Sequence, residues 1–250
     1  ARLAALGPEG IDLNFGCPER SVVKNECCSA MQQPHLREKA AQIIEATQRG
    51  LSYSTISRSP KSAQGRTLRK MPLSIKTRLG FDRIDYSWHE FLLGFKPAML
   101  TVHVRTTRQM SKVPAQWEAI VPIIELRDKI SPETKIVLNG DVMSRQQGEE
   151  LADKYRVDGI MIGRGIFHDP FCFAAQSPWE QMSKDERIAL LKKHILLHQE
   201  NYPNGERPFN PLKKFAKIYI QGFPGASDLR DQIMHANSVE ESMVILEKVV

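Results

Sequence analysis

Five short apolar runs, separated by longer segments of helical periodicity, restrict the fold of this 250-residue chain more than any other feature. The runs span residues 11–14, 71–76, 99–103, 135–139 and 157–163, and each closes on polar or glycine residues. Helical patterns with one apolar face occupy residues 36–49, 117–129 and 145–155. Apolar strands that alternate with helices are typical of βαβ units around a parallel sheet. The sequence therefore predicts an α/β fold with a parallel sheet.

Polar residues follow the predicted strands at corresponding points. They are Cys17, Lys76, His103, Asn139 and Arg164. In parallel α/β folds, functional groups collect at the carboxyl ends of the strands. We therefore expect a functional site at this edge of the sheet.

The stretch I-D-L-N-F-G-C-P, at residues 11–18, is the strongest local indication of chemistry. Gly16 lets the backbone turn where the first strand ends, and Pro18 fixes the next φ near −65°. The thiol of Cys17 is thus held in a rigid turn, which favours a reactive role. A small buried apolar residue at a strand end is the alternative interpretation.

The charge balance favours an anionic partner. The 35 Lys and Arg residues exceed the 29 Asp and Glu residues, giving a net charge of +6. This excess favours a polyanion or a phosphorylated ligand, and an ordinary solvated basic surface is the alternative.

The four cysteines have the spacing of neither a zinc site nor a secreted disulfide scaffold. They are Cys17, Cys27, Cys28 and Cys172. We therefore expect a reducing compartment and no metal. No run of 18 apolar residues or signal pattern occurs, so we also expect no association with a membrane.

Two segments interrupt the strand–helix alternation. Residues 51–70 are rich in Ser, Arg, Lys and Thr, and we interpret them as a solvated insertion, with RNA contact as the alternative. After Trp179 only helical patterns remain: capping sequences open helices at Ser183 and Ser238, and another helix lies between Pro211 and Gly222. We therefore predict a domain at 1–179 and a helical domain at 180–250, whose basic faces suit RNA or ordinary amphipathic packing.

Five motifs, taken in order, resemble the tRNA-dihydrouridine synthases. They are I-D-L-N-F-G-C-P, S-I-K-T-R, T-V-H-V-R-T, L-N-G-D-V and I-M-I-G-R-G-I-F. The helical tail, with L-K-K-F-A-K-I-Y-I-Q-G-F-P-G, resembles the RNA-binding domain of that family. The resemblance implies a TIM-type (β/α)8 barrel that holds FMN, uses NADPH as reductant and reduces a uracil base in tRNA. It also implies a cytoplasmic monomer without metal.

The resemblance assigns a role to each strand-end residue. Cys17 becomes the proton donor, because a thiol in water still carries its proton at neutral pH. Lys76 approaches the N1/O2 edge of the flavin, and His103 lies beside flavin and substrate. The phosphate end of the flavin site is formed by Asn139, Gly140, Asp141, Gly163 and Arg164. A paired strand-end lysine and a satisfied core histidine are the alternatives for Lys76 and His103.

Three further residues are assigned to the substrate by the same resemblance. Asn14 orients substrate or flavin through its amide, and Arg78 and Arg105 line the tRNA channel. Salt bridges to neighbouring residues are the alternative for the two arginines.

The chain departs from the family pattern in three ways. A closed barrel needs eight strands, so we expect three to precede residue 1 and the barrel to be incomplete at the N-terminus. Glu26 stands where the family usually has a glycine, and Val104 stands where it commonly has a smaller residue. Two other functions therefore stay open: a truncated, non-catalytic RNA-binding remnant, and another FMN-dependent barrel oxidoreductase that acts on a small dihydropyrimidine. The basic helical tail argues against the latter.

Overall fold

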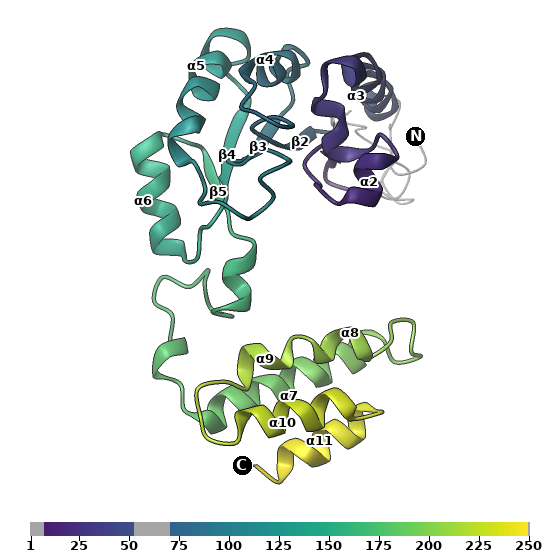
Figure 1. The fold of residues 1–250 in the computed structure, drawn as a ribbon, viewed down its shortest axis with the longest axis vertical. Coiled ribbons are helices and arrows are strands. Elements are labelled where there is room, and N and C mark those ends of the chain that lie inside the picture. Colours follow the sequence, from purple (N-terminus) through teal and green to yellow (C-terminus); the bar gives the residue numbers. More distant parts are fainter. Residues whose placement is uncertain (1–7, 53–70, 250) are drawn as a thin grey trace, which may run out of the picture. The chain divides into compact units, whose positions relative to one another are not determined.

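The computed structural model describes residues 8–52 and 71–249 (Figure 1). Most of the predicted insertion at 51–70 thus lies outside the described residues. The chain divides into two compact units. The first comprises Ala1–Val142 and Gln146–Gly163, and the second comprises Met143–Arg145 and Arg164–Val250.

The described part of the first unit contains one parallel sheet with the strand order β1-β2-β3-β4-β5. The strands are β1 (Ile11–Asn14), β2 (Leu73–Arg78), β3 (Met99–His103), β4 (Lys135–Asn139) and β5 (Gly159–Met161). All neighbouring pairs are parallel. The predicted five-stranded parallel sheet is therefore confirmed, and the sequential strand order is that of consecutive βα units.

Helices follow the strands along the chain (Figure 1). The predicted helices at 36–49, 117–129 and 145–155 are confirmed as α3 (Arg37–Ser52), η3 (Trp117–Ile120) with α5 (Val121–Ile130), and α6 (Arg145–Tyr155). Two further helices, α2 (Arg20–Lys24) and α4 (Tyr86–Gly94), were not predicted from the sequence. Asp85 caps α4 by accepting a hydrogen bond from the Ser87 amide at 3.1 Å. Two short turns, η1 (Cys28–Gln32) and η2 (Pro34–Leu36), join α2 to α3.

The two faces of the sheet differ in chemistry because side chains alternate along each strand. One face is apolar and buried, and it packs in a core with Trp88 of α4 and Ile123 of α5. Its central residues are Leu73, Ile75, Leu100, Val102, Ile136 and Leu138. The other face carries polar side chains, and these determine where a site can form.

The second unit is helical. It contains η4 (Arg164–Phe167), η5 (Trp179–Gln181), α7 (Lys184–Asn201), α8 (Asn210–Lys213), α9 (Ala216–Tyr219), α10 (Ala226–His235) and α11 (Val239–Glu247). The capping box predicted at Ser183 and Glu186 is present. Ser238 caps α11, while the Glu241 carboxylate accepts from the Asn237 amide at 2.7 Å. Trp179, the last residue of the first predicted domain, lies in the core of this unit.

Candidate active site

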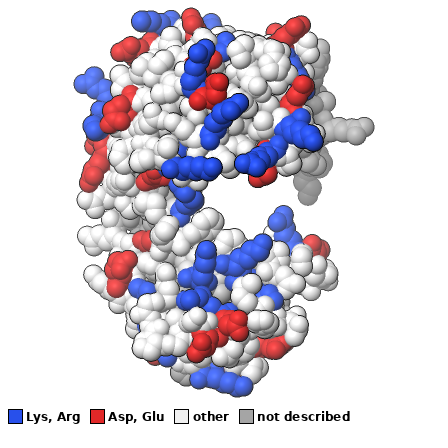
Figure 2. Space-filling view, viewed as in Figure 1, with Lys and Arg blue, Asp and Glu red and all other residues white. Residues whose placement is uncertain are grey.

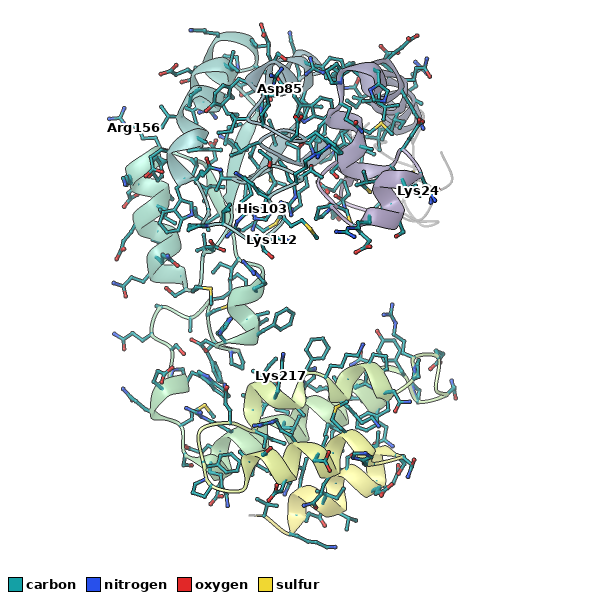
Figure 3. The ribbon with its side chains drawn as sticks, viewed as in Figure 1. Lys24, Asp85, His103, Lys112, Arg156 and Lys217 are labelled. Atoms are coloured by element: carbon teal, nitrogen blue, oxygen red, sulfur yellow. The ribbon has the colours of Figure 1, made fainter. Side chains whose placement is uncertain are left out.

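The strand register brings the predicted site residues to one face of the sheet. Asn14 pairs with Lys76, and Arg78 pairs with His103. His103 in turn pairs with Asn139. Paired positions in parallel strands point to the same side, and residues two apart on one strand share a face. All five side chains therefore project from the polar face, with His103 at the end of β3 (Figure 3).

Cys17 lies in the turn after β1, and the backbone leading to it is held at four consecutive points. The Asn14 side-chain oxygen accepts from the Gly16 amide at 3.0 Å. The Phe15 amide donates to the Lys76 carbonyl at 2.7 Å. The carbonyl of Phe15 accepts from Gln32 Nε2 at 3.1 Å, and the carbonyl of Gly16 accepts from Arg78 Nε at 2.8 Å. The half-buried thiol therefore sits on a backbone with little freedom to move.

The Arg78 guanidinium is buried, with only 6% of the residue exposed. Besides Gly16, it donates to the carbonyls of Thr106 and Met110 at 3.2 and 3.0 Å. Burial and the neighbouring Arg105 lower the pKa of Arg78 to about 10. Arg78 thus joins the Cys17 turn to the loop after β3, and its predicted contact with tRNA stays a prediction.

Arg105 links His103 to Asp141. Its guanidinium donates to His103 Nε2 at 3.0 Å and forms an ion pair with the Asp141 carboxylate. It also donates to the Val113 carbonyl at 2.6 Å, and only 2% of the residue is exposed. The alternative raised for Arg105, a salt bridge to a neighbouring residue, is thus observed. Its predicted place along the tRNA path stays a prediction.

His103 is held as a neutral imidazole. Because a guanidinium can only donate, Nε2 of His103 acts as the acceptor and its remaining proton lies on Nδ1. Burial lowers the pKa of His103 to about 3, and the positive charges of Arg78, Lys76 and Arg105 add to this effect, which Asp141 opposes. The histidine therefore presents an Nδ1 proton donor at every pH near neutrality.

Lys76 carries a half-buried ammonium on the same face. No carboxylate pairs with it in residues 8–52 and 71–249. Burial and the positive charge of Arg78 lower the pKa of Lys76, whereas Asp12 and Cys17 oppose the change. An unpaired cation in a partly desolvated position is suited to binding an anion.

Gly140 and Asp141 continue the chain from β4 in unusual backbone conformations, with φ values of 132° and 53°. A Cβ on Gly140 would lie 3.1 Å from His103 Cδ2 and 3.2 Å from Ala115 Cβ. The bare side of Gly140 is thus filled by protein, and the glycine lets the His103 ring pack closely. Asn139 donates from Nδ2 to the Met161 carbonyl at 2.8 Å, which fixes its amide.

The remaining two predicted phosphate ligands lie at the junction of the units. Gly163 ends the described first unit, and a Cβ there would meet no atom within 4 Å. Arg164 opens η4 in the second unit, where it is exposed. Their predicted role in binding phosphate stays a prediction.

Sequence reasoning missed two buried polar residues that belong to this site. Gln32 donates to Thr107 Oγ1 at 3.2 Å as well as to Phe15, so it ties the Cys17 turn to the loop after β3. Thr101 lies between Lys76 and Val137 on the polar face, and its buried Oγ1 has no hydrogen-bond partner among the residues that the structure describes. Threonine is common in strands and Gln32 lies 15 residues beyond Cys17, so neither stood out in the sequence.

The described part of the chain offers neither a metal site nor a membrane span. Within residues 8–52 and 71–249, no group of three or more His, Cys, Asp and Glu residues could hold a metal ion. No described helix is both long and apolar enough to cross a membrane.

A parallel sheet of consecutive βα units, with polar side chains at its carboxyl edge, is typical of α/β barrels of the TIM type, and the five described strands match part of such a barrel. Comparison with known families narrows this class. The family model described as Dihydrouridine synthase (Dus) matches residues 1–250, and this chain belongs to that family. The fold class and the resemblance predicted from the sequence are thereby confirmed.

Similar curated proteins carry related names. A "Probable tRNA-dihydrouridine synthase" of Staphylococcus epidermidis is 42% identical over 248 residues, which covers 98% of this chain and 69% of that protein. A "Probable tRNA-dihydrouridine synthase 2" of Bacillus subtilis is 41% identical over 249 residues, again with 98% and 69% coverage. The chain thus spans about two thirds of the length of these relatives.

Replacing Gly140 with alanine is expected to destabilise the first unit by about 1–3 kcal/mol, because a φ of 132° suits only glycine and the new methyl group would press on His103. Urea unfolding measures the loss. Gly94→Ala is the matched control, because a Cβ at this last residue of α4 meets nothing within 4 Å. Equal stability of the two variants would contradict the packing role of Gly140.

Stability should fall with acidity in a way that depends on His103. Its folded pKa of about 3 lies below the ordinary value of 6.5, so the unfolded chain binds the proton first as the pH falls. The contribution of His103 to the free energy of unfolding is fully present above pH 6.5. It decreases as the pH falls from 6.5 to 3. The His103→Gln variant keeps an acceptor for Arg105 but cannot titrate. The slope of its free energy of unfolding against pH should therefore be smaller by about 1.4 kcal/mol per pH unit near pH 5.

Urea unfolding at pH 7.5 and pH 5 measures this slope. His89 is also buried with its pKa lowered to about 4, so part of the slope persists in the variant. Exposed His35 provides the control as His35→Gln, which should retain the slope of the unsubstituted protein. An unchanged slope in His103→Gln would contradict a neutral, buried imidazole.

Proposed function

We propose that this chain reduces a uracil base in tRNA to dihydrouridine, with FMN as the flavin, NADPH as reductant and Cys17 as proton donor. The family match supports dihydrouridine synthesis by an oxidoreductase, and the names of the relatives support tRNA as substrate. The single observation that carries the proposal is the shared polar face: the Cys17 turn, Lys76 and His103 lie at the same edge of one sheet.

The side chains on this face fit an anionic, planar ligand such as FMN. The Lys76 ammonium has no carboxylate partner in the described residues, and the buried Thr101 hydroxyl beside it has no partner either. Both are unsatisfied groups whose burial is unfavourable until a ligand contacts them. Lys76 would hold the N1/O2 edge of the ring, and His103 would donate from Nδ1 to flavin or substrate. Asn139, Gly140, Asp141, Gly163 and Arg164 would hold the phosphate end.

Reduction of the uracil C5–C6 double bond requires one hydride and one proton. When bound, FMN supplies the hydride for C6, as the family resemblance implies. The Cys17 thiol gives its proton to C5, and the sulfur is left as a thiolate. Lys76 and Arg78 are the cations that interact electrostatically with Cys17.

The protein contributes orientation as well as charge. Gln32 and Arg78 hold the two carbonyls that precede Cys17, and Asn14 holds the Gly16 amide. A proton donor must lie within hydrogen-bond reach of the atom that it protonates, and a rigid turn maintains that distance. The side-chain nitrogen of Asn14 is left to orient substrate or flavin. The uracil itself must leave its stack in the tRNA before it can reach this face.

Cys17→Ala is expected to reduce dihydrouridine formation about a hundredfold or more, because the proton then has to come from water. Mass spectrometry of tRNA incubated with holoenzyme and NADPH measures the product. The bound flavin, measured by its visible absorbance, should be unaffected. Cys27→Ala is the control, because Cys27 is an exposed thiol of the same loop region. Normal product formation by Cys17→Ala would exclude Cys17 as the proton donor.

Lys76→Met is expected to weaken FMN binding about tenfold or more, since it removes a charge-assisted contact from a partly buried position. Fluorescence titration of the apoprotein with FMN measures the dissociation constant. Lys135→Met is the control: Lys135 starts β4 at the opposite end of the strand, where it pairs with Asp158. Equal affinities in the two variants would remove Lys76 from the flavin site.

A further inference from the structure

The helical unit displays an exposed aromatic ring, Phe167, stacked on the half-buried Phe215, which packs against the core of this unit. Phe167, the last residue of η4, is 46% exposed, and the preceding Ile166 is 41% exposed. The ring of Phe167 stacks on Phe215 with centroids 5.5 Å apart and planes 22° from parallel. Exposed apolar residues that cluster in this way mark interaction surfaces more often than isolated ones do.

Two lysines without carboxylate partners lie next to this pair. Lys214 and Phe215 have right-handed helical backbone angles, so the chain from α8 to α9 follows a helical path throughout. Lys214 and Lys217, three residues apart, therefore share one helix face, and both are exposed. Neither pairs with a carboxylate in the described part of the chain. Figure 3 shows Lys217 on the side of α9 that faces away from α10 and α11.

The adjacent Lys213 is oriented inward. It is buried and donates to the carbonyls of Met234 and Ala236, at 2.9 and 2.8 Å, at the end of α10. This anchor fixes the rotation of α8, so Lys214 has to face outward. Figure 2 shows Lys and Arg side chains gathered at the edge of this unit formed by α8 and α9. The ammonium group of Lys214 is thus kept on the outer surface of the helical unit.

We propose that Phe167, Phe215, Lys214 and Lys217 form a platform on which an unpaired base of the substrate tRNA stacks, while the lysines contact the flanking phosphates. The proposal rests on the proposed function and adds a specific contact to it. A base offers a flat apolar face next to negative charge, and this surface offers aromatic rings next to unpaired cations. A purely apolar partner would leave the two lysines without a counterpart. The target is a loop nucleotide, because bases inside a helix already stack on their neighbours.

The test uses the full chain and measures its affinity for an unmodified tRNA transcript by fluorescence anisotropy at several salt concentrations. Phe167→Leu keeps an apolar side chain but removes the aromatic face, so we expect affinity to fall about fivefold or more with an unchanged salt dependence. Lys217→Ala should instead reduce the slope of log affinity against log salt by about 0.7–0.9. Phe173→Leu is the control for an exposed phenylalanine, because Phe173 is 57% exposed, and it should bind normally.

The outcomes separate this proposal from the proposed function. If the unsubstituted protein binds and modifies tRNA but Phe167→Leu binds within twofold of it, the stacking platform is wrong and the function stands. Equal losses in Phe167→Leu and Phe173→Leu would also overturn the platform. A change of mass in light scattering with unchanged tRNA affinity would identify the patch as a contact between copies of the chain. If the unsubstituted protein neither binds nor modifies tRNA, both proposals fail.

Discussion

An excess of buried positive charge controls the organisation of the first unit. Lys76, Arg78 and Arg105 lie at one edge of the sheet, and Asp141 is the carboxylate that pairs with one of them. Burying cations is unfavourable unless other groups replace their hydration. Backbone carbonyls of Gly16, Thr106, Met110 and Val113 do so for the two arginines. The loop carbonyls thus replace the hydration of the two guanidinium groups, and the same hydrogen bonds hold the loops in place.

This arrangement determines what the site can accept. The two arginines are largely occupied by protein acceptors, whereas Lys76 has no carboxylate partner in the described residues. Burial, together with the positive charges of Arg78, Lys76 and Arg105, keeps His103 neutral, and Lys76 and Arg78 interact electrostatically with Cys17. The edge of the sheet thus combines a neutral hydrogen-bond donor, a cation without a carboxylate partner in the described residues, and a thiol.

Much of this site was predictable from the sequence, because strand periodicity and strand-end residues are local signals. The register of the parallel strands then places these strand-end residues on one face of the sheet, as the pairs Asn14–Lys76 and Arg78–His103 show. Glu26, which the resemblance predicts to replace a glycine, has a φ of 51°, in the left-handed region that favours glycine. Cys28 has a similar φ of 49°, so this turn twice places a side chain in a conformation that favours glycine.

What the sequence did not show depends on contacts between distant residues. Arg78 can be buried because carbonyls from two separate loops accept its hydrogen bonds. The hydrophobic periodicity of the sequence carries no information about these contacts. The role of Gln32 depends on Thr107, 75 residues away. Helix α4 was missed because Tyr86–Gly94 combines aromatic residues with a terminal glycine and lacks a clear apolar stripe. Its position is set by tertiary packing of Trp88 and by the Asp85 cap.

The two compact units solve different physical problems for an enzyme of this kind. A single uracil offers few atoms, so contacts to that base alone supply little of the affinity for a whole tRNA. Affinity has to come from phosphates and from bases outside the reacting one. In the first unit, Arg78 and Arg105 are engaged by backbone carbonyls, and Lys76 is assigned to the flavin in the proposed function. The exposed Lys214 and Lys217 of the helical unit remain available to the nucleic acid. The proposed function therefore predicts that substitutions in separate units alter chemistry and RNA affinity independently.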